Sequence, residues 1–184
     1  MATRLPGTTI EISALTRDIS RQMFDGIFAS GGITLSQVSI MTGLEPYLIQ
    51  NWVKRGFVSS PVKRSYSRRQ FSRIVIINML REALQIDKIC ELIHIIGGET
   101  DDESDDLIGD DELYHRYVNM LSEGNINVSD SESVMEAAKR ACGDYDSNIP
   151  NARERLARIL SVMLYAHYAS KLRSSAEELF STLH

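Results

Sequence analysis

Four polar side chains within one short segment could bind a nucleic acid: Tyr47, Gln50, Asn51 and Lys54. Their spacing places them on one face if residues 45–55 form a helix. Amides such as those of Gln50 and Asn51 can pair bidentately with the N6/N7 edge of adenine in a major groove. Lys54 suits a phosphate, and Tyr47 suits a sugar or a phosphate. A polar face that only meets water has the same periodicity, so the spacing alone leaves both interpretations open.

The opposite face of the same segment is apolar. Ile49, Trp52, Val53 and Gly56 follow the i, i+3, i+4, i+7 pattern of a buried helical stripe. We therefore expect Trp52, the only tryptophan, to lie in the core beneath the polar face.

The charge distribution favours a polyanionic partner. The span from Tyr47 to Arg81 contains no Asp or Glu. Its eight basic residues are Lys54, Arg55, Lys63, Arg64, Arg68, Arg69, Arg73 and Arg81. The rest of the chain holds 12 basic and 25 acidic residues. A block of one sign inside an acidic protein indicates a local site for a polyanion, whereas a solvated face usually mixes signs.

A short wing is predicted over residues 57–67. Pro61 disfavours a central strand there. Lys63 and Arg64 would lie at the tip of the wing, within reach of backbone phosphates. Tyr66 is expected to pack inward rather than bind, because it buries a large apolar body.

Three arginines follow the wing. Ser67 would cap the next helix, which places Arg68, Arg69 and Arg73 in its first two turns. Arginine at a helix start opposes the helix dipole, and phosphates bound at that site would explain its presence.

These side chains require a helix-turn-helix to position them. The pattern predicts a first helix over residues 34–41, capped by Thr34 or Ser36, and a turn at Gly43. A second helix would start at Glu45-Pro46 and run to Arg55. With the wing and the helix that follows it, the segment forms a winged helix-turn-helix.

The stretch GLEPYLIQNWVKRGFVSSPVKRSYSRRQF resembles the MerR-type winged helix. The matching residues are Gly43, Ile49, Trp52, Gly56, Phe57, Val58, Pro61, Arg64, Tyr66, Ser67 and Phe71. IQNWVKRG together with SPVKRSYSRRQF is also similar to an uncharacterised bacterial family, domain of unknown function 1836. The resemblance covers residues 34–96.

This resemblance implies an all-α fold, a MerR-like winged helix-turn-helix with a helical C-terminal extension. It also implies a transcriptional regulator that binds double-stranded DNA as a homodimer, paired through a helix after the winged domain. An effector of unknown identity, small molecule or protein, would act on the C-terminal part.

Three regions are expected. Residues 1–32 would be an N-terminal arm (1–15) and a supporting amphipathic helix (17–29), and residues 33–98 would be the winged domain. Residues 99–184 would hold an acidic linker and a helical dimerisation or regulatory region. The stretch GETDDESDDLIGDDE carries nine acidic residues and lacks the DxDxDG spacing of a calcium loop, so a solvated linker is the favoured interpretation.

The C-terminal half reads as helical. Residues 86–96 and 114–124 carry apolar stripes, and Ser129 with Glu132 predicts a capping box for a helix ending near Ala141. Pro150 would open the longest helix, running to Leu183. Its apolar face over residues 156–168 and beyond is wide, which favours packing against both its own chain and a second copy.

Composition excludes several other functions. Cys90 and Cys142 have no CxxC or Cys/His spacing, so neither a metal site nor a disulfide framework is expected. We expect that the protein has no cofactor and is not an enzyme, because no nucleophile–base pair or Gly-rich phosphate loop is evident.

The N-terminus lacks the apolar region of a secretory signal and no run is long enough for a membrane span, so we expect a cytoplasmic protein.

One alternative stays open. The chain could be a protein-interaction module on a winged-helix scaffold that does not read DNA sequence. The acidic second half favours this alternative, as does Gln50, because MerR-type proteins usually carry Arg at that position.

Overall fold

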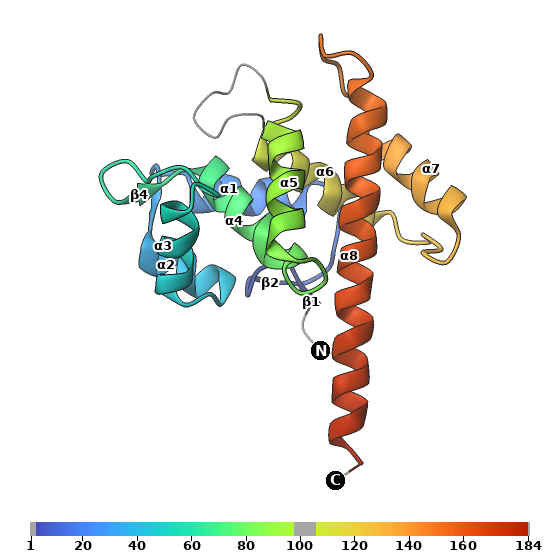
Figure 1. Cartoon of the computed structure of the whole chain (residues 1–184), viewed down its shortest axis with the longest axis horizontal. Helices are drawn as coiled ribbons and strands as arrows, with labels where there is room; N and C mark the ends of the chain where they lie inside the picture. Colours follow the sequence, from blue (N-terminus) through green and yellow to red (C-terminus); the bar gives the residue numbers. More distant parts are fainter. Residues whose placement is uncertain (1–2, 98–105, 184) are drawn as a thin grey trace.

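The computed structural model describes residues 3–97 and 106–183, and these residues are mostly helical (Figure 1). The elements are β1 (Thr3–Arg4), β2 (Glu11–Ile12), α1 (Ile19–Ile27), β3 (Ile33–Thr34), α2 (Leu35–Thr42), α3 (Pro46–Lys54), β4 (Ser65–Tyr66), α4 (Arg68–Leu80), α5 (Ile86–Gly97), α6 (Asp110–Ser122), α7 (Ser131–Ala141) and α8 (Ala152–Ser181). The strands form two short antiparallel pairs, β1 with β2 and β3 with β4. The expected helical class is therefore confirmed.

Helices α2 and α3 begin and end close to the residues that the local sequence predicts. The hydroxyl of Thr34 accepts a hydrogen bond from Gln37 N, and the Gln37 side chain accepts from Thr34 N, which forms a capping box. Gly43 ends α2 with a φ of 70°, which glycine adopts without strain. Pro46 then occupies the first turn of α3.

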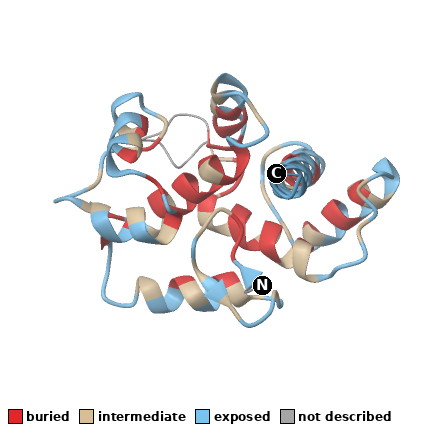
Figure 2. Ribbon diagram, turned by 90° about the horizontal axis from the view of Figure 1, so that it is seen from below, coloured by how far each residue is buried: buried red, intermediate tan, exposed pale blue. Residues whose placement is uncertain are grey.

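Helix α4 lies at the centre of the molecule, where the buried ribbon is concentrated (Figure 2). Ser67 caps it through a second capping box with Gln70, as predicted. The helix is buried on nearly all sides because its run from residue 74 to residue 80 is apolar at every position except Asn78.

From residue 3 the N-terminal segment is packed rather than free, which corrects the arm expected over residues 1–15; residues 1–2 lie outside the described part. β1 pairs with β2, and Leu5 in the connecting loop is fully buried. The carbonyl of Gly7 accepts a hydrogen bond from Asn78 Nδ2 at 2.9 Å, and Thr9 N donates to Met41 O at 2.8 Å. These two hydrogen bonds hold the segment against α2 and α4.

The core continues from the helices of the basic region into the C-terminal half. Helix α4 packs on α6 and α8, and α1 packs on α6. One cluster of buried apolar side chains joins residues on both sides of the domain boundary expected after residue 98.

Within the described residues, none of the helices combines the length and apolar character that a membrane span requires.

Two helix starts differ from the sequence prediction. Asp130, not Ser129, caps α7, because its carboxylate accepts a hydrogen bond from Glu132 N at 3.0 Å. Ser129 instead donates its backbone N–H to Asn127 Oδ1. Helix α8 begins at Ala152 rather than at Pro150, because Asn151 adopts a left-handed φ of 56°.

Helix α8 has a packed half and a free half. The apolar face expected over residues 156–168 is covered by α4, α6 and α7 of the same chain, so that part needs no second copy. The C-terminal half of the helix projects past the rest of the molecule (Figure 1), although Arg173 still pairs with Glu82, which follows α4. The exposed apolar side chains on this projecting half are Leu172, Leu179 and Phe180, and Leu183 follows the helix.

Candidate functional site

The outward face of α3 carries the four predicted polar side chains. Tyr47 is 70% exposed, and Gln50, Asn51 and Lys54 are also exposed. On the opposite face Ile49 and Trp52 are buried and Val53 is half-buried, with Trp52 only 3% exposed. Gly56, which was expected to continue this stripe, is exposed because α3 ends at Lys54. The predicted division of this helix into two faces is confirmed, because a stripe of apolar residues at helical spacing holds α3 on the core.

Lys63 and Arg64 occupy the two central positions of a tight turn. Ser65 N donates to Val62 O at 2.9 Å, and Val62 and Ser65 form an isolated antiparallel bridge. The φ angles of Lys63 and Arg64 are 49° and 64°. This geometry is that of a type I′ turn, which favours Asn and Gly at its centre. Two basic residues therefore hold a strained backbone, a pattern that concentrates at functional positions.

The wing itself differs from a long hairpin. Its strand β4 pairs with β3, which precedes α2, in the register Ile33 to Tyr66 and Thr34 to Ser65. This pairing fixes the end of the wing segment against the start of α2. Tyr66 is buried, as expected.

A groove of about 460 Å³ lies between α3 and the wing segment. It is lined by Leu35, Gln50, Val53, Pro61, Arg64 and Tyr66. Gln50 and Arg64 therefore lie on the same concavity, although they come from a helix and from a turn. The groove joins the two sets of residues that the sequence assigned to base and phosphate contact.

The first of the three arginines on α4 has a surface partner. Arg68 forms an ion pair with Asp25 of α1. Hydrogen bonding to this guanidinium lowers the pKa of the Asp25 carboxyl. Asp25 is exposed, so the pair contributes little to stability and a phosphate could replace the carboxylate.

The other two arginines face inward, which corrects their assignment to phosphate contact. Arg73 is 4% exposed, and its Nε donates to both carboxylate oxygens of Asp110, at 3.0 and 3.1 Å. Arg69 binds Asp106 and, at 3.2 Å, Asp110. Burial raises the pKa of Asp106, although the adjacent Arg69 opposes this shift. A Cβ at position 97 would lie 2.7 Å from Arg73 Nη2, so a side chain there would displace this guanidinium.

The partners of these arginines were missed because they are distant in the sequence. Asp106 and Asp110 belong to the acidic stretch, of which residues 98–105 lie outside the described part. One indication was present: Arg73 interrupts the apolar run of α4, and a charge in such a position must be paired.

Three cations remain available on this face. Lys54, Lys63 and Arg64 are exposed, and no described carboxylate lies within ion-pairing distance of them. Arg55, beside them, lies over the ring of Phe57 at 4.5 Å from its centroid. The site is therefore a positive rim around α3 and the turn, with two amides between the charges.

The described residues contain no group of three or more His, Cys, Asp or Glu side chains arranged to hold a metal ion. The two buried or half-buried histidines have structural partners. Nδ1 of His115 is 2.9 Å from Ser20 Oγ, and the His167 ring packs edge-on against Tyr117.

Residues 32–117 match the family model described as a domain of unknown function (DUF1836). The resemblance to this family that the sequence indicates over residues 34–96 is confirmed, and it extends through α5 into α6. The matched segment therefore includes both Arg73 and Asp110. No curated protein and no solved structure matches the chain.

Proposed function

We propose that this protein is a transcriptional regulator that binds double-stranded DNA. Helix α3 would enter the major groove, and the turn at residues 62–65 would contact the phosphate backbone. The observation that carries this proposal is the positive rim formed by Lys54, Lys63 and Arg64 beside the exposed amides of Gln50 and Asn51. Affinity for DNA comes largely from such charges, and specificity comes from groups that reach base edges.

The backbone arrangement supports a winged helix-turn-helix of the MerR type. Helices α2 and α3 are joined by a short turn at Gly43, and β3 and β4 tie the wing segment to the start of α2. In a helix-turn-helix protein the second helix lies in the major groove. Here that helix is α3, whose polar face is free.

Each exposed residue has a proposed role. Gln50 and Asn51 would pair with bases, and Lys54 and Tyr47 would contact the backbone next to the groove. Lys63 and Arg64 would contact phosphates from the turn. Arg68 would exchange Asp25 for a phosphate at the edge of the site, whereas Arg69 and Arg73 serve the fold.

We also propose a homodimer formed by the free half of α8. Tyr165, Leu172 and Leu179 are seven residues apart and lie on one side of the helix, next to Ala176. This apolar stripe has no cover in the described part of the chain. Lys171 precedes Ser175, and Glu178 follows it, so two antiparallel copies would place these opposite charges together. This self-complementarity favours a second copy as the occupant.

A specific observation favours the alternative of a protein-interaction module. The large apolar side chains of Ile40, Tyr47 and Val62 are about 70% exposed around α2, α3 and the turn. Exposed apolar groups near a groove are typical of protein-binding surfaces. A protein ligand lying in the groove beside Gln50 and Arg64 would use them.

The salt dependence of binding to a random-sequence duplex separates the two functions. Each phosphate neutralised by the protein adds about 0.9 to the slope of log affinity against log salt concentration. We expect a steep slope that the double variant Lys63→Gln/Arg64→Gln reduces by roughly 2 per protomer. The matched control is Lys139→Gln/Arg140→Gln, an adjacent exposed pair on α7, on the other side of α8 from α3 (Figure 1).

Sequence preference tests the role of the amides. Gln50→Ala or Asn51→Ala should reduce discrimination between bases by roughly 1–3 kcal/mol per contact, with little change in the salt slope. If the protein binds no duplex at low salt, DNA binding is wrong and the interaction module is the better function.

A further inference from the structure

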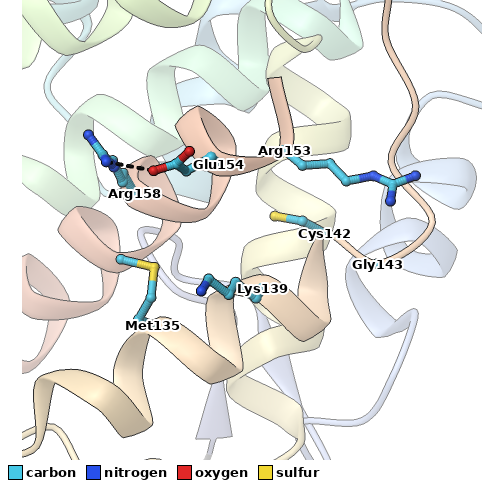
Figure 3. A pocket seen from close by; sticks show the side chains of 7 residues that line it. All are labelled: Met135, Lys139, Cys142, Gly143, Arg153, Glu154 and Arg158. Carbon is cyan, nitrogen blue, oxygen red and sulfur yellow. Dashed lines mark hydrogen bonds and ion pairs between the residues drawn. The ribbon is translucent and has the colours of Figure 1, made fainter. Parts of the chain in front are cut away.

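A second pocket, far from α3, lies between α7 and the beginning of α8 (Figure 3). Its volume is about 480 Å³, within the range of small-molecule sites. The residues that line it are Met135, Lys139, Cys142, Gly143, Arg153, Glu154 and Arg158.

The floor of this pocket is apolar and uncharged. Met135 of α7 and Cys142, the residue after α7, provide it, and the sulfur of Cys142 points into the space between the helices (Figure 3). Cys142 is 1% exposed, and burial raises the pKa of its thiol to about 11. The thiol is therefore protonated at neutral pH and offers a surface for an apolar group.

The rim of the pocket is positive. Lys139 has no carboxylate partner among the described residues. Arg158 Nη2 lies 2.6 Å from Glu154 Oε1, and this carboxylate is the only acidic group lining the pocket. At the other end, Arg153 donates from Nε to the carbonyl of Tyr145. The pocket thus has three cations and one carboxylate in a protein with a net charge of −5.

We propose that this pocket binds a small amphiphilic carboxylate. Its apolar body would lie on Met135 and Cys142, and its carboxylate would contact Lys139 and Arg158. An anion with an apolar body fits both parts of the site, because the exposed ammonium of Lys139 can contact its charge while its body covers Met135 and Cys142. A neutral apolar molecule would use only the apolar part. The proposal does not depend on DNA binding.

The site also connects two elements with different roles. One wall belongs to α7, and the other belongs to the helix whose far half we propose to join two copies. A ligand bound here would stabilise the packing of α7 on α8, since binding to the folded state alone adds to its stability.

The test uses two fluorescent probes that differ mainly in charge. The anionic probe is 8-anilinonaphthalene-1-sulfonate, and the neutral one is N-phenyl-1-naphthylamine. We expect saturable binding of the anionic probe at one site per chain, with displacement by decanoate and not by decanol. Lys139→Gln should weaken the anionic probe about tenfold, the loss expected for one charge-assisted contact, and should change the neutral probe less than about twofold.

Two further variants test the role of charge. Glu154→Gln removes the only carboxylate among the described residues that line the pocket, and should strengthen binding of the anionic probe by about two- to fivefold. Because partly unfolded states also bind this probe, the gain must occur at one site per chain and with the urea midpoint unchanged. Arg140→Gln changes the residue next to Lys139, which does not line the pocket, and should leave both probes unaffected. Equal binding of both probes, or an anionic probe that responds to neither Lys139→Gln nor Glu154→Gln, would overturn the proposal.

Discussion

Nε of Arg73 on α4 lies 3.0 Å from Oδ1 of Asp110 on α6, and both side chains are almost completely buried. The pair joins the central helix of the basic region to the first turn of the C-terminal half. Asp110 also stands at the start of α6, where a negative charge is favourable to the helix dipole. A charge that looks available for DNA in the sequence is therefore part of the core.

Removing one member of this pair should be strongly destabilising. We expect Arg73→Ala to lower the free energy of unfolding by about 3–5 kcal/mol, because the buried Asp110 would keep only its contact with Arg69. Arg158→Ala, which breaks the exposed pair with Glu154, should cost less than about 1 kcal/mol. Urea denaturation measures both. Equal effects of the two variants would contradict a structural role for Arg73.

The double variant Arg73→Met/Asp110→Leu refines this test. Replacing a whole buried pair by apolar residues is often neutral, because no uncompensated charge remains. We expect it to recover most of the stability lost in Arg73→Ala. No recovery would mean that packing of the arginine stem, rather than its charge, determines the loss.

Substitutions in the turn at residues 62–65 should change the stability of the protein and its affinity for DNA in opposite directions. Replacing Lys63-Arg64 by Asn-Gly should raise the free energy of unfolding by about 1–2 kcal/mol, since both positions have a left-handed φ. The same variant should weaken DNA binding because two cations are lost. Lys54→Gln is the control: it should weaken DNA binding with little change in stability. A variant that gains stability and keeps full DNA affinity would exclude the turn from the interface.

Stability should fall in mild acid because of buried histidines. Burial lowers the pKa of His115 to about 4, whereas the ordinary value of an exposed histidine is near 6.5. Between these values the unfolded chain binds a proton that the folded chain does not. Stability is therefore fully present above about pH 6.5 and declines as the pH falls toward 4. Burial lowers the pKa of His167 to about 4 as well, so it adds to the same decline.

Thermal or urea unfolding across this range measures the effect. At about 1.36 kcal/mol per pKa unit, His115 alone contributes on the order of 3 kcal/mol. His115→Gln keeps a polar group beside Ser20 and should flatten part of the decline. A profile that is flat between pH 6.5 and 4.5 would show that His115 titrates normally.

The local features of the basic region could be predicted from the sequence because they are set by neighbouring residues. Thr34 and Ser67 cap their helices through residues three positions later. The buried position of Trp52 follows from apolar spacing within α3 alone. The polar face and the buried face of α3 can therefore be predicted from the sequence of this helix alone.

Features set by distant residues could not be predicted in this way. Asp110 lies 37 residues after Arg73, and nothing in either segment specifies the other. Likewise, the packing of Gly7 on α4 depends on Asn78, 71 residues away. The face of α8 expected to need a partner is covered by α4, α6 and α7 of the same chain. Sequence periodicity shows that a face is apolar but not what covers it.

The final prediction concerns the free half of α8, which we propose to pair with a second copy. Leu172 and Leu179 are each 68% exposed and are seven residues apart. Full-length protein should sediment as a dimer at micromolar concentration, because a stripe of this kind is seldom left uncovered. Leu172→Glu/Leu179→Glu should sediment as a monomer, since the added charges would meet each other across an antiparallel pair.

A matched control adds the same two charges to the other side of this helix. Ser174 and Ser181 are exposed and also seven residues apart, so Ser174→Glu/Ser181→Glu should remain dimeric. DNA affinity should fall in the leucine variant and persist in the serine variant, because a twofold dimer presents two recognition helices roughly 34 Å apart to one pseudo-palindromic site. If the wild-type protein sediments as a monomer, or if both double variants dissociate alike, this stripe does not form the dimer and a palindromic site is no longer expected.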